Sequence, residues 1–347
     1  MKKAALILAV LVLAVSSPAQ QRTGTIFGKI VDTQGKPLPG VTVTLSSPLT
    51  GSLRTITNET GVFRYPAIYP GRDYSVKAER IDFKTVNRAN VIVTIGATAA
   101  INLTLEAGKI EEQVTIATVT PIVDVRKMTE STSLNREELQ TLPTARDPWV
   151  ILQLVPAVML DRENVGGNES GQQSSFVTKG DSGNGANNIW ALDGIDITDP
   201  ALLGDSALFF DFDTFEELSV TTGGAADVTT QTGGIAVNMV TRRGGNKVSA
   251  AARFYLTDHS LQSSNVTPAL RAKGIIDTNR IEQIKDFGAS AGGPLFKDRL
   301  WWWGSYGVQD IFTYTIYNTR DQSLLSNYSF KLNAQPFSGN RFEALVT

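Results

Sequence analysis

The chain contains 347 residues and carries a formal net charge of −2, with one histidine and no cysteine. A chain of this length corresponds to roughly two or three domains. The lack of a basic excess argues against nucleic acid as a partner. The lack of cysteine excludes a disulfide framework and thiolate chemistry.

Residues 1–19 have the three parts of a secretory signal peptide. Two lysines precede an apolar run from Ala4 to Val15, and the small residues Ser17 and Ala19 follow. The run is too short to span a bilayer, which takes about 20 apolar residues. We therefore expect export and cleavage near Ala19. Because no other stretch is continuously apolar, any membrane passage should use strands.

Residues 20–107 alternate between apolar and polar side chains and are interrupted by turn clusters. Ile26 and Ile30 share one face of a predicted strand, as do Val41 and Val43. This period of two predicts half-buried strands in a small β-sandwich. The words GTIFGKIVD, GKPLPGVTV and PGRDYSV resemble the carboxypeptidase-regulatory-like, or transthyretin-like, domain. The resemblance implies a binding or spacer module.

Two positions depart from the pattern of that domain. Arg72 and Asp73 lengthen the turn after Pro70 and Gly71, and Asp82 stands where glycine is common. Both departures lie at turns, so we expect them to alter turn geometry and leave the fold intact.

The sequence does not favour an enzyme. A zinc peptidase combines histidine and glutamate ligands, whereas His259 is the only histidine and falls in a predicted loop. A Ser-His-Asp site is not expected either, because we identify no G-x-S-x-G elbow and because His259 falls in a predicted barrel loop. We predict no catalytic residue, no cofactor and no metal site.

Residues 108–120 are interpreted as a linker that includes an extended segment. The word EEQVTIAT mixes polar and β-branched residues, which favours a strand. An exposed strand can add to the edge of a partner's sheet through its backbone, and Val114, Thr115 and Ile116 are the candidate contact residues. The alternatives are a last strand of the sandwich or a plain linker.

Residues 121–246 are predicted to form a small α/β domain. Asn135 and Glu138 have the spacing of a helix N-cap pair, and Asp147 followed by Pro148 predicts a second helix start. The following leucines and valines should pack on a sheet as core residues. They are Leu139, Leu142, Val150, Leu152 and Val155.

Strands and glycine turns follow in this domain. Short apolar runs at 189–192, 217–222 and 235–241 each end at a glycine-containing turn. A further short strand is predicted at 176–180. The turn residues singled out by this pattern are Asp193, Gly194, Gly233 and Gly234.

Several acidic residues of this domain allow two interpretations. Asp193, Asp196 and Asp199, with Asp181 and Asn184 upstream, could supply oxygen ligands for calcium. Their spacing is not that of the twelve-residue calcium loop. Aspartates that bond their own backbone in turns explain the same pattern, and we favour that interpretation.

Residues 247–347 change to longer alternating strands. Val248, Phe254 and Leu256 share one predicted face, and Arg253 lies on the other. This pattern is typical of transmembrane barrel strands. Trp301, Trp302 and Trp303 follow a short turn, which predicts an aromatic girdle in contact with outer-membrane lipid. A soluble sandwich core is the alternative.

The words LDGI, EELSVTTG, TGGIAVNMVTRRGGN and GGPLFKDRLWW resemble TonB-dependent outer-membrane receptors. The resemblance implies a mainly β chain: a transthyretin-like sandwich, an α/β plug domain and the start of a transmembrane β-barrel. It implies a plug that gates ligand uptake, and a periplasmic TonB-type energy-coupling partner that binds Val114 to Ile116. It also implies an unknown small-molecule or oligosaccharide ligand near residues 180–188 and 200–210.

The sequence is expected to contain only about five or six barrel strands, whereas the barrels of such receptors close with about 22 strands. We therefore expect a fragment of a longer receptor or a truncated gene product. The alternative function is a secreted or surface-attached β-sandwich protein that binds carbohydrate or protein and transports nothing.

Overall fold

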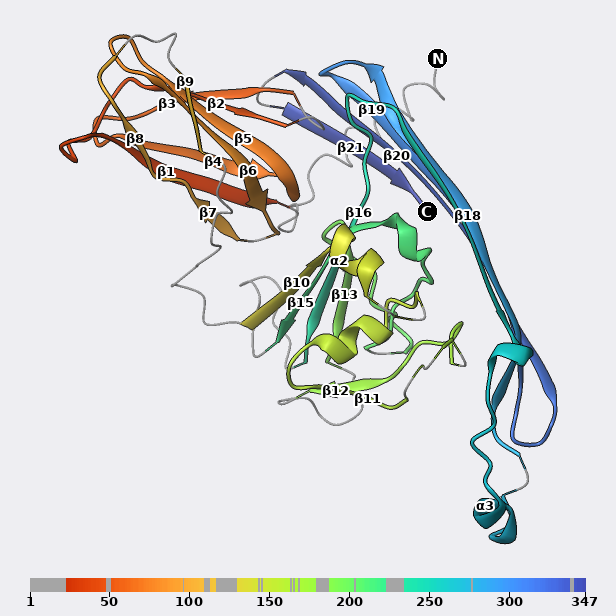
Figure 1. Cartoon of the computed structure of the whole chain (residues 1–347). Coiled ribbons are helices and arrows are strands. Elements are labelled where there is room, and N and C mark those ends of the chain that lie inside the picture. Colours follow the sequence, from red (N-terminus) through yellow and green to blue (C-terminus); the bar gives the residue numbers. More distant parts are fainter. Residues whose placement is uncertain are drawn as a thin grey trace.

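The computed structural model describes residues 23–47, 51–95, 97–108, 113–116, 130–142, 144, 146–162, 164, 166–167, 169–178, 187–202, 204–222, 234–275, 277–337 and 340–347. The predicted signal peptide, Gly233, Asp181, Asn184 and most of the expected ligand loop at 180–188 lie outside these residues. Figure 1 shows a mainly β arrangement of three units: a sandwich, a small α/β domain and a long sheet that runs alongside both.

The sandwich consists of two sheets. One has the order β4-β1-β7 with β8 also paired to β1, and the other has the order β3-β2-β5-β6-β9. The predicted alternation is confirmed, because Ile26, Ile30, Val41 and Val43 are all fully buried in the core between the sheets. The strands are β1 (Gly24–Asp32), β2 (Thr42–Ser46), β3 (Leu53–Ile56), β4 (Val62–Ile68), β5 (Gly71–Glu79), β6 (Thr85–Val93), β7 (Thr98–Ala100), β8 (Leu103–Leu105) and β9 (Gln113–Ile116).

The two sequence departures have local effects, as expected. Asp82 adopts a left-handed backbone with φ of 68°, a conformation that glycine adopts without strain and aspartate tolerates. The register of β5 against β6 shifts between Gly71 and Tyr74. Arg72 and Asp73 are thus accommodated at the start of β5 as an irregularity, where both are exposed.

The α/β domain, which we call the plug domain, is built on one sheet with the order β10-β15-β16-β13-β14. The predicted capping box is confirmed, since Asn135 and Glu138 bond each other's backbone at the start of α2. Its elements are β10 (Glu130–Asn135), α2 (Arg136–Thr141), η2 (Val150–Leu154), β11 (Val158–Leu160), β12 (Phe176–Thr178), β13 (Ile189–Leu192), β14 (Ile195–Asp196), η3 (Phe212–Thr214), β15 (Phe215–Thr222) and β16 (Ala236–Thr241).

The second predicted helix is shorter than expected. Asp147 accepts a hydrogen bond from Trp149 N at 2.8 Å, but the helix that follows is the five-residue 3-10 helix η2. It ends before Pro156, because the residue preceding a proline is disfavoured in helical geometry. Leu152 and Val155 still reach the plug core together with Leu139, and Leu142 packs against that core.

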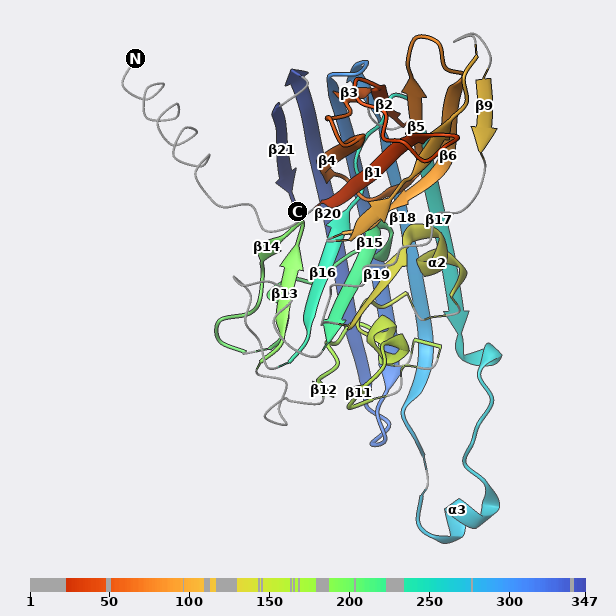
Figure 2. The same ribbon diagram turned by 90° about the vertical axis from the view of Figure 1, so that its left-hand side faces the viewer.

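The third unit, which we call the wall, is an antiparallel sheet with the sequential order β17-β18-β19-β20-β21. The loop that carries α3 lies at the end of the wall remote from the sandwich, and Figure 2 shows the same arrangement from the side. The elements of the wall are β17 (Ser249–Asp258), η4 (His259–Leu261), α3 (Pro268–Ala272), β18 (Arg280–Phe296), β19 (Leu300–Tyr314), β20 (Arg320–Phe337) and β21 (Asn340–Val346).

The wall has an apolar face and a face that meets the plug domain. Val248, Phe254 and Leu256 are 79%, 65% and 49% exposed, as the alternation predicted. Arg253, between two of them, contacts acidic residues of the plug domain. No helix among the described residues has the length and apolar character needed to cross a membrane.

Candidate functional site: the contact between plug domain and wall

The Asp193–Gly194 turn joins β13 to β14 as the sequence predicted. Leu192 pairs with Ile195 across a two-residue loop, and both loop residues have positive φ, 49° for Asp193 and 75° for Gly194. This is the geometry of a type I′ hairpin turn, in which Asp-Gly is a preferred pair.

Asp193 is more than a turn residue, because its carboxylate holds three groups. Oδ1 accepts from Thr241 N at 3.0 Å, and Oδ2 accepts from Thr241 Oγ1 at 2.6 Å and from Lys331 Nζ at 2.9 Å. Thr241 ends β16 of the plug domain, whereas Lys331 lies on β20 of the wall. The predicted turn is therefore a contact point between two units.

Lys331 is fully enclosed at this contact, with 2% of its side chain exposed. Besides Asp193 it pairs with Glu343 of β21, and its Nζ donates to Thr241 Oγ1 at 2.8 Å. Two carboxylates thus face one ammonium group. A buried charge that loses its partner costs roughly 3–5 kcal/mol, so these residues, the lysine cluster, depend strongly on one another.

A second charged cluster lies further along the wall. Arg253 NH2 contacts Asp211 Oδ1 at 2.7 Å, its NH1 contacts Asp213 Oδ2 at 2.8 Å, and its Nε contacts Asp286 Oδ1 at 2.8 Å. Arg146 bridges the same groups, reaching Asp213 Oδ1 at 2.8 Å and Asp286 Oδ2 at 3.1 Å. We call these five residues the arginine cluster. Both units supply arginine and aspartate to it.

The environment shifts the pKa values of Asp211 and Asp213, the two plug-domain aspartates of this cluster, in opposite directions. Burial raises the pKa of Asp211, although Arg253 opposes that shift. Burial would also raise the pKa of Asp213, but hydrogen bonds and charge from Arg146 and Arg253 outweigh it and lower that pKa. Of these two aspartates, Asp213 is therefore held more firmly in its charged form.

Arg146 is held in an unusual conformation. Its φ is 57°, a left-handed value that costs a non-glycine residue roughly 1–3 kcal/mol. Its guanidinium lies 5.3 Å from the Phe212 ring centroid and 4.8 Å from that of Tyr255 on the wall. Such strain persists only where surrounding contacts fix it, and the arginine cluster supplies those contacts.

The three tryptophans do not share one face of β19, which limits the predicted girdle. Trp301 and Trp303 are only 4% and 1% exposed. Trp301 Nε1 donates to Asn246 Oδ1 at 2.7 Å, and the Arg242 guanidinium lies 5.4 Å from the Trp303 ring centroid. Because side chains alternate along a strand, Trp302 points to the opposite face. The girdle remains a prediction that only Trp302 is placed to fulfil.

The aspartates considered for calcium act as turn residues. Asp196 Oδ1 accepts from Thr198 N at 2.9 Å, and Asp199 Oδ1 accepts from Ala201 N at 2.7 Å. Within the described residues, no group of three or more histidine or acidic side chains is arranged to hold a metal ion.

The expectation that the sequence lacks a G-x-S-x-G motif is wrong. Gly288 to Gly292 has the spacing G-x-S-x-G, but it lies inside β18, not at the strand-to-helix turn that a nucleophile elbow requires. Ser290 accepts a hydrogen bond from Arg242 NH1 at 3.1 Å. It pairs with Ala251 of β17, whereas His259 follows the opposite end of that strand. The motif therefore forms no hydrolase site.

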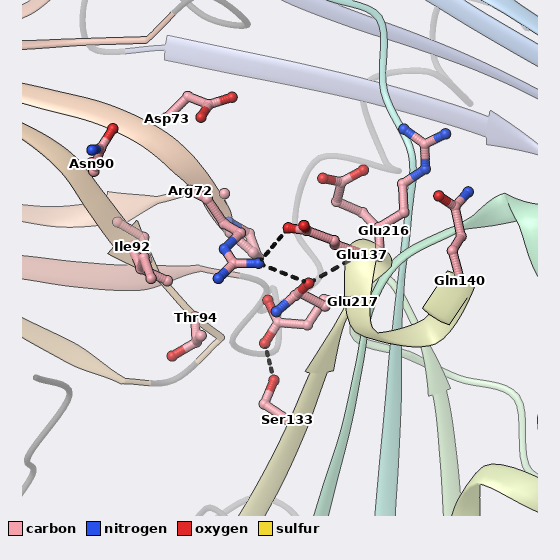
Figure 3. A pocket seen from close by; sticks show the side chains of 15 residues that line it. Arg72, Asp73, Asn90, Ile92, Thr94, Ser133, Glu137, Gln140, Glu216 and Glu217 are labelled. Atoms are coloured by element: carbon pink, nitrogen blue, oxygen red, sulfur yellow. Dashed lines mark hydrogen bonds and ion pairs between the residues drawn. The ribbon is translucent and has the colours of Figure 1, made fainter. Parts of the chain in front are cut away.

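The sandwich meets the plug domain around a cavity of about 480 Å³ (Figure 3). Glu217 of β15 is 3% exposed at this boundary. It accepts hydrogen bonds from Ser133 Oγ and, at 3.4 Å, from Ile95 N of the sandwich. Burial raises the pKa of Glu217 to about 7. A carboxyl group that titrates near neutrality thus lies between two units.

The segment proposed to bind a partner is a strand in this structure. Val114, Thr115 and Ile116 belong to β9, which pairs in parallel with Val86 to Arg88 of β6. β9 is the end strand of its sheet. This placement matches the alternative of a last sandwich strand, and partner binding by the same residues remains a prediction. Gly234, the described residue of the other predicted turn, directly precedes Ile235 and β16.

Sequence patterns did not identify the residues of the two clusters. Arg253 was placed on the polar face of its strand, but its partners were not foreseen. The available signal is a charged residue on the inward face of an alternating barrel-type strand, which also applies to Asp286 and Lys331.

The hydrophobic cores of the units are separate. The sandwich core is formed by sandwich residues and the plug core by plug residues. Among the described wall residues, Leu345 is the apolar side chain that packs against the plug core. Apart from Leu345, the described plug core is thus formed by plug-domain side chains, and both charged clusters lie at the contact with the wall.

Comparisons with known proteins agree with this architecture. Residues 25–106 match the carboxypeptidase regulatory-like domain. Over 308 residues the chain is 28% identical to the TonB-dependent transporter Oar of Myxococcus xanthus. The aligned region covers 85% of this chain and 27% of Oar. The chain thus spans about a quarter of that relative's length.

Similar solved structures include two with low sequence identity. P. aeruginosa FpvA bound to heterologous pyoverdines has a TM-score of 0.42 at 12% identity, covering 62% of this chain and 24% of FpvA. The outer membrane transporter YddB from Escherichia coli has a TM-score of 0.42 at 14% identity, covering 60% of this chain and 31% of YddB.

Proposed function

We propose that this chain, which is similar in sequence to a TonB-dependent transporter, acts at the outer membrane and that its plug domain is the gate for ligand uptake. The observation that carries this proposal is the lysine cluster together with the arginine cluster. Each joins the plug domain to the wall through charged groups. Contacts of this kind hold one position firmly and can be exchanged for water when the plug moves.

An apolar contact would behave differently. A continuous hydrophobic core between plug domain and wall would gain free energy with every buried side chain and would resist separation. A buried ion pair repays its desolvation only while its geometry is intact. Displacement of one partner therefore weakens the whole cluster. A gate needs this property, since it must stay closed at rest and open under force.

The energy-coupling partner is a periplasmic TonB-type protein that pairs with the β9 backbone. β9 supports this role because it is an end strand with a single described neighbour, β6. Its pairing spans only four residue pairs, so separation from the sandwich requires few hydrogen bonds to break. The partner's strand either adds to the outer edge of β9 or replaces β6.

These two modes of partner binding can be separated with proline, which cannot donate a backbone hydrogen bond. Successive N–H groups of a strand point to opposite edges. Val114→Pro with Ile116→Pro therefore removes donors from one edge, and Thr115→Pro removes a donor from the other. Peptides of residues 111–118 with these changes should differ in binding to the partner's periplasmic domain. Equal binding of all three peptides would exclude strand addition here.

The ligand is a small molecule or an oligosaccharide that contacts loops of the plug domain. Residues 200–210 lie in the plug domain between β14 and η3. Identification of the ligand requires uptake measurements with the protein in its own membrane.

The proposed gate can be tested by measuring whether the outer membrane becomes permeable when the two clusters are disrupted. Lys331→Met combined with Arg253→Met removes the central cation of each cluster, so the plug domain should loosen. Cells that produce this variant should become sensitive to a large hydrophilic antibiotic that the outer membrane excludes. Lys297→Met, at an exposed turn, is the matched control and should leave sensitivity unchanged.

Two results would contradict the proposal. Variant protein that stays in the membrane fraction at normal abundance without any leak would show that the clusters do not hold a gate. Wild-type protein that washes from membranes with salt, without detergent, would favour the alternative of a secreted or surface-attached binding sandwich.

A further inference from the structure

The turn from Tyr69 to Tyr74, which we call the docking turn, joins β4 to β5 of the sandwich. We propose that the docking turn holds the sandwich against plug domain and wall at the same time, so that plug displacement releases the sandwich. This inference rests on the proposed gate in one respect only, since it assumes that the plug domain moves. It assigns the sandwich a regulatory role beyond that of a spacer.

The first contact of the docking turn is with the wall. Tyr69 Oη donates to Glu343 Oε2 at 3.0 Å. Glu343 is the same carboxylate that pairs with Lys331, and Lys331 in turn binds Asp193 at 2.9 Å. A continuous series of polar contacts therefore runs from the sandwich through the wall to the plug turn.

The second contact is with the chain that leaves the plug domain. The Arg243 guanidinium lies 4.1 Å from the centroid of the Tyr69 ring, a close cation–π distance. Arg243 NH2 also donates to Tyr74 Oη at 3.3 Å, and Tyr74 Oη donates to Tyr69 O at 3.0 Å. Arg243 lies two residues beyond Thr241, the end of β16. Any shift of β16 must therefore displace Arg243 from the docking turn.

The third contact is with the start of the plug helix. Arg72 NH1 donates to Glu137 Oε2 at 2.8 Å (Figure 3). It also donates to Oδ1 of the N-cap residue Asn135 at 3.3 Å. Arg72 belongs to the inserted pair of residues that shifts the register of β5. The insertion that departs from the domain pattern thus carries the side chain that reaches α2.

These contacts differ in strength. The side chains of Arg72 and Glu137 are 43% and 76% exposed, so this pair contributes little by itself. Tyr69 is half-buried, and its hydroxyl meets a carboxylate that is 10% exposed. Hydrogen bonds to charged groups are stronger than neutral ones. Tyr69 should accordingly dominate, with Arg72 as a secondary contact.

Coupling between two sites is reciprocal. If plug displacement releases the docking turn, loss of the docking turn must loosen the plug domain to the same extent. This reciprocity separates a coupling device from a passive contact, because a passive contact would show only local effects. It also allows a test that does not depend on ligand or uptake.

The experiment is hydrogen exchange measured by mass spectrometry on the intact protein in membrane vesicles. Tyr69→Phe removes the hydroxyl that meets Glu343 and keeps the ring under Arg243. Exchange in the plug hairpin β13–β14 should become roughly tenfold faster, although Tyr69 touches neither strand. Conversely, Lys331→Met should accelerate exchange at residues 69–74 by a similar factor. Tyr317→Phe, at a tyrosine that is 84% exposed, is the matched control.

A second pair of variants protects the test against simple misfolding of the sandwich. Arg72→Glu should accelerate exchange at the docking turn by a smaller factor, and Arg72→Glu with Glu137→Arg should restore it. Changes confined to the sandwich in Tyr69→Phe, with β13–β14 unaffected, would overturn the proposal. A different result would contradict the proposed gate but not the coupling. In that case Tyr69→Phe would accelerate hydrogen exchange in β13–β14 and Lys331→Met would accelerate it at residues 69–74, while the membrane stayed impermeable to the antibiotic.

Discussion

Lys331 Nζ lies 2.9 Å from Asp193 Oδ2, and the two residues are 138 positions apart in the chain. The aspartate sits in a hairpin turn of the plug domain, and the lysine lies on an inner face of the wall. A single contact therefore joins a locally determined feature to a long-range one.

Lys331→Met should destabilise the contact between plug domain and wall by roughly 3–5 kcal/mol, because Asp193 and Glu343 remain buried without their cation. Adding Asp193→Asn should recover part of this loss, since one uncompensated charge is removed. Denaturant titration of the purified protein measures both changes. Equal stability of the single and double variants would show that the two residues are not coupled.

Gly194→Ala should destabilise the β13–β14 hairpin by about 1–2 kcal/mol, the cost of placing a β-carbon in the left-handed region. The φ of Gly194 is 75°. Gly51→Ala is the control, since Gly51 has an ordinary φ and the nearest atoms to an added β-carbon lie at 3.6 Å. Thermal unfolding of the two variants should differ, and an unchanged midpoint for Gly194→Ala would contradict the turn assignment.

Glu217 should make stability depend on pH around neutrality. Its pKa is raised from 4.5 to about 7 in the folded protein. A raised pKa stabilises the fold below pH 4.5, where the group is protonated in both states, and this contribution is lost as pH rises through about 7. Glu217→Gln should remove the dependence, with a gain of about 3 kcal/mol relative to wild type above pH 7.

The measurement for Glu217 is thermal unfolding at intervals between pH 5 and pH 8.5. Asp147, whose pKa burial raises to about 6, shifts stability in the same direction, so variant and wild type must be compared at each pH. Glu216→Gln is the neighbouring control. Parallel pH profiles for wild type and Glu217→Gln would refute a raised pKa at this position.

Trp302 and Trp303 should respond differently to membrane lipid. Brominated lipids quench tryptophans at the lipid interface, so Trp302→Phe should reduce the quenchable fraction of fluorescence. Trp303→Phe should leave that fraction unchanged, because Trp303 is 1% exposed and packs beside Arg242. If Trp303→Phe lowers quenching as strongly, this face of β19 is turned toward lipid.

Local patterns predicted several elements of the fold. The period of two located the sandwich strands, because each strand buries one face, as Ile26 and Ile30 show. The Asp193–Gly194 pair predicted a hairpin turn, because its backbone angles are favoured by those two residue types. Asn135 and Glu138 predicted a helix start from bonds that lie within one helical turn.

Long-range partners could not be predicted in this way. The alternation of apolar and polar residues predicts that Arg253 faces inward. It does not identify Asp211 or Asp286 as the partners of Arg253, since these residues lie on other elements. The tryptophans illustrate the same limit. Composition favoured a girdle for all three, whereas strand alternation and packing separate Trp302 from Trp301 and Trp303.

The separate cores of the sandwich and plug domain bear on how the protein is assembled. Each of these units buries most of its apolar side chains among its own residues, without side chains of the wall. Lys331 is desolvated only when the wall meets the plug domain. Insertion of the wall strands is therefore the step at which that charge must find Asp193, and a wall that inserted without a folded plug domain would leave Lys331 with Glu343 alone.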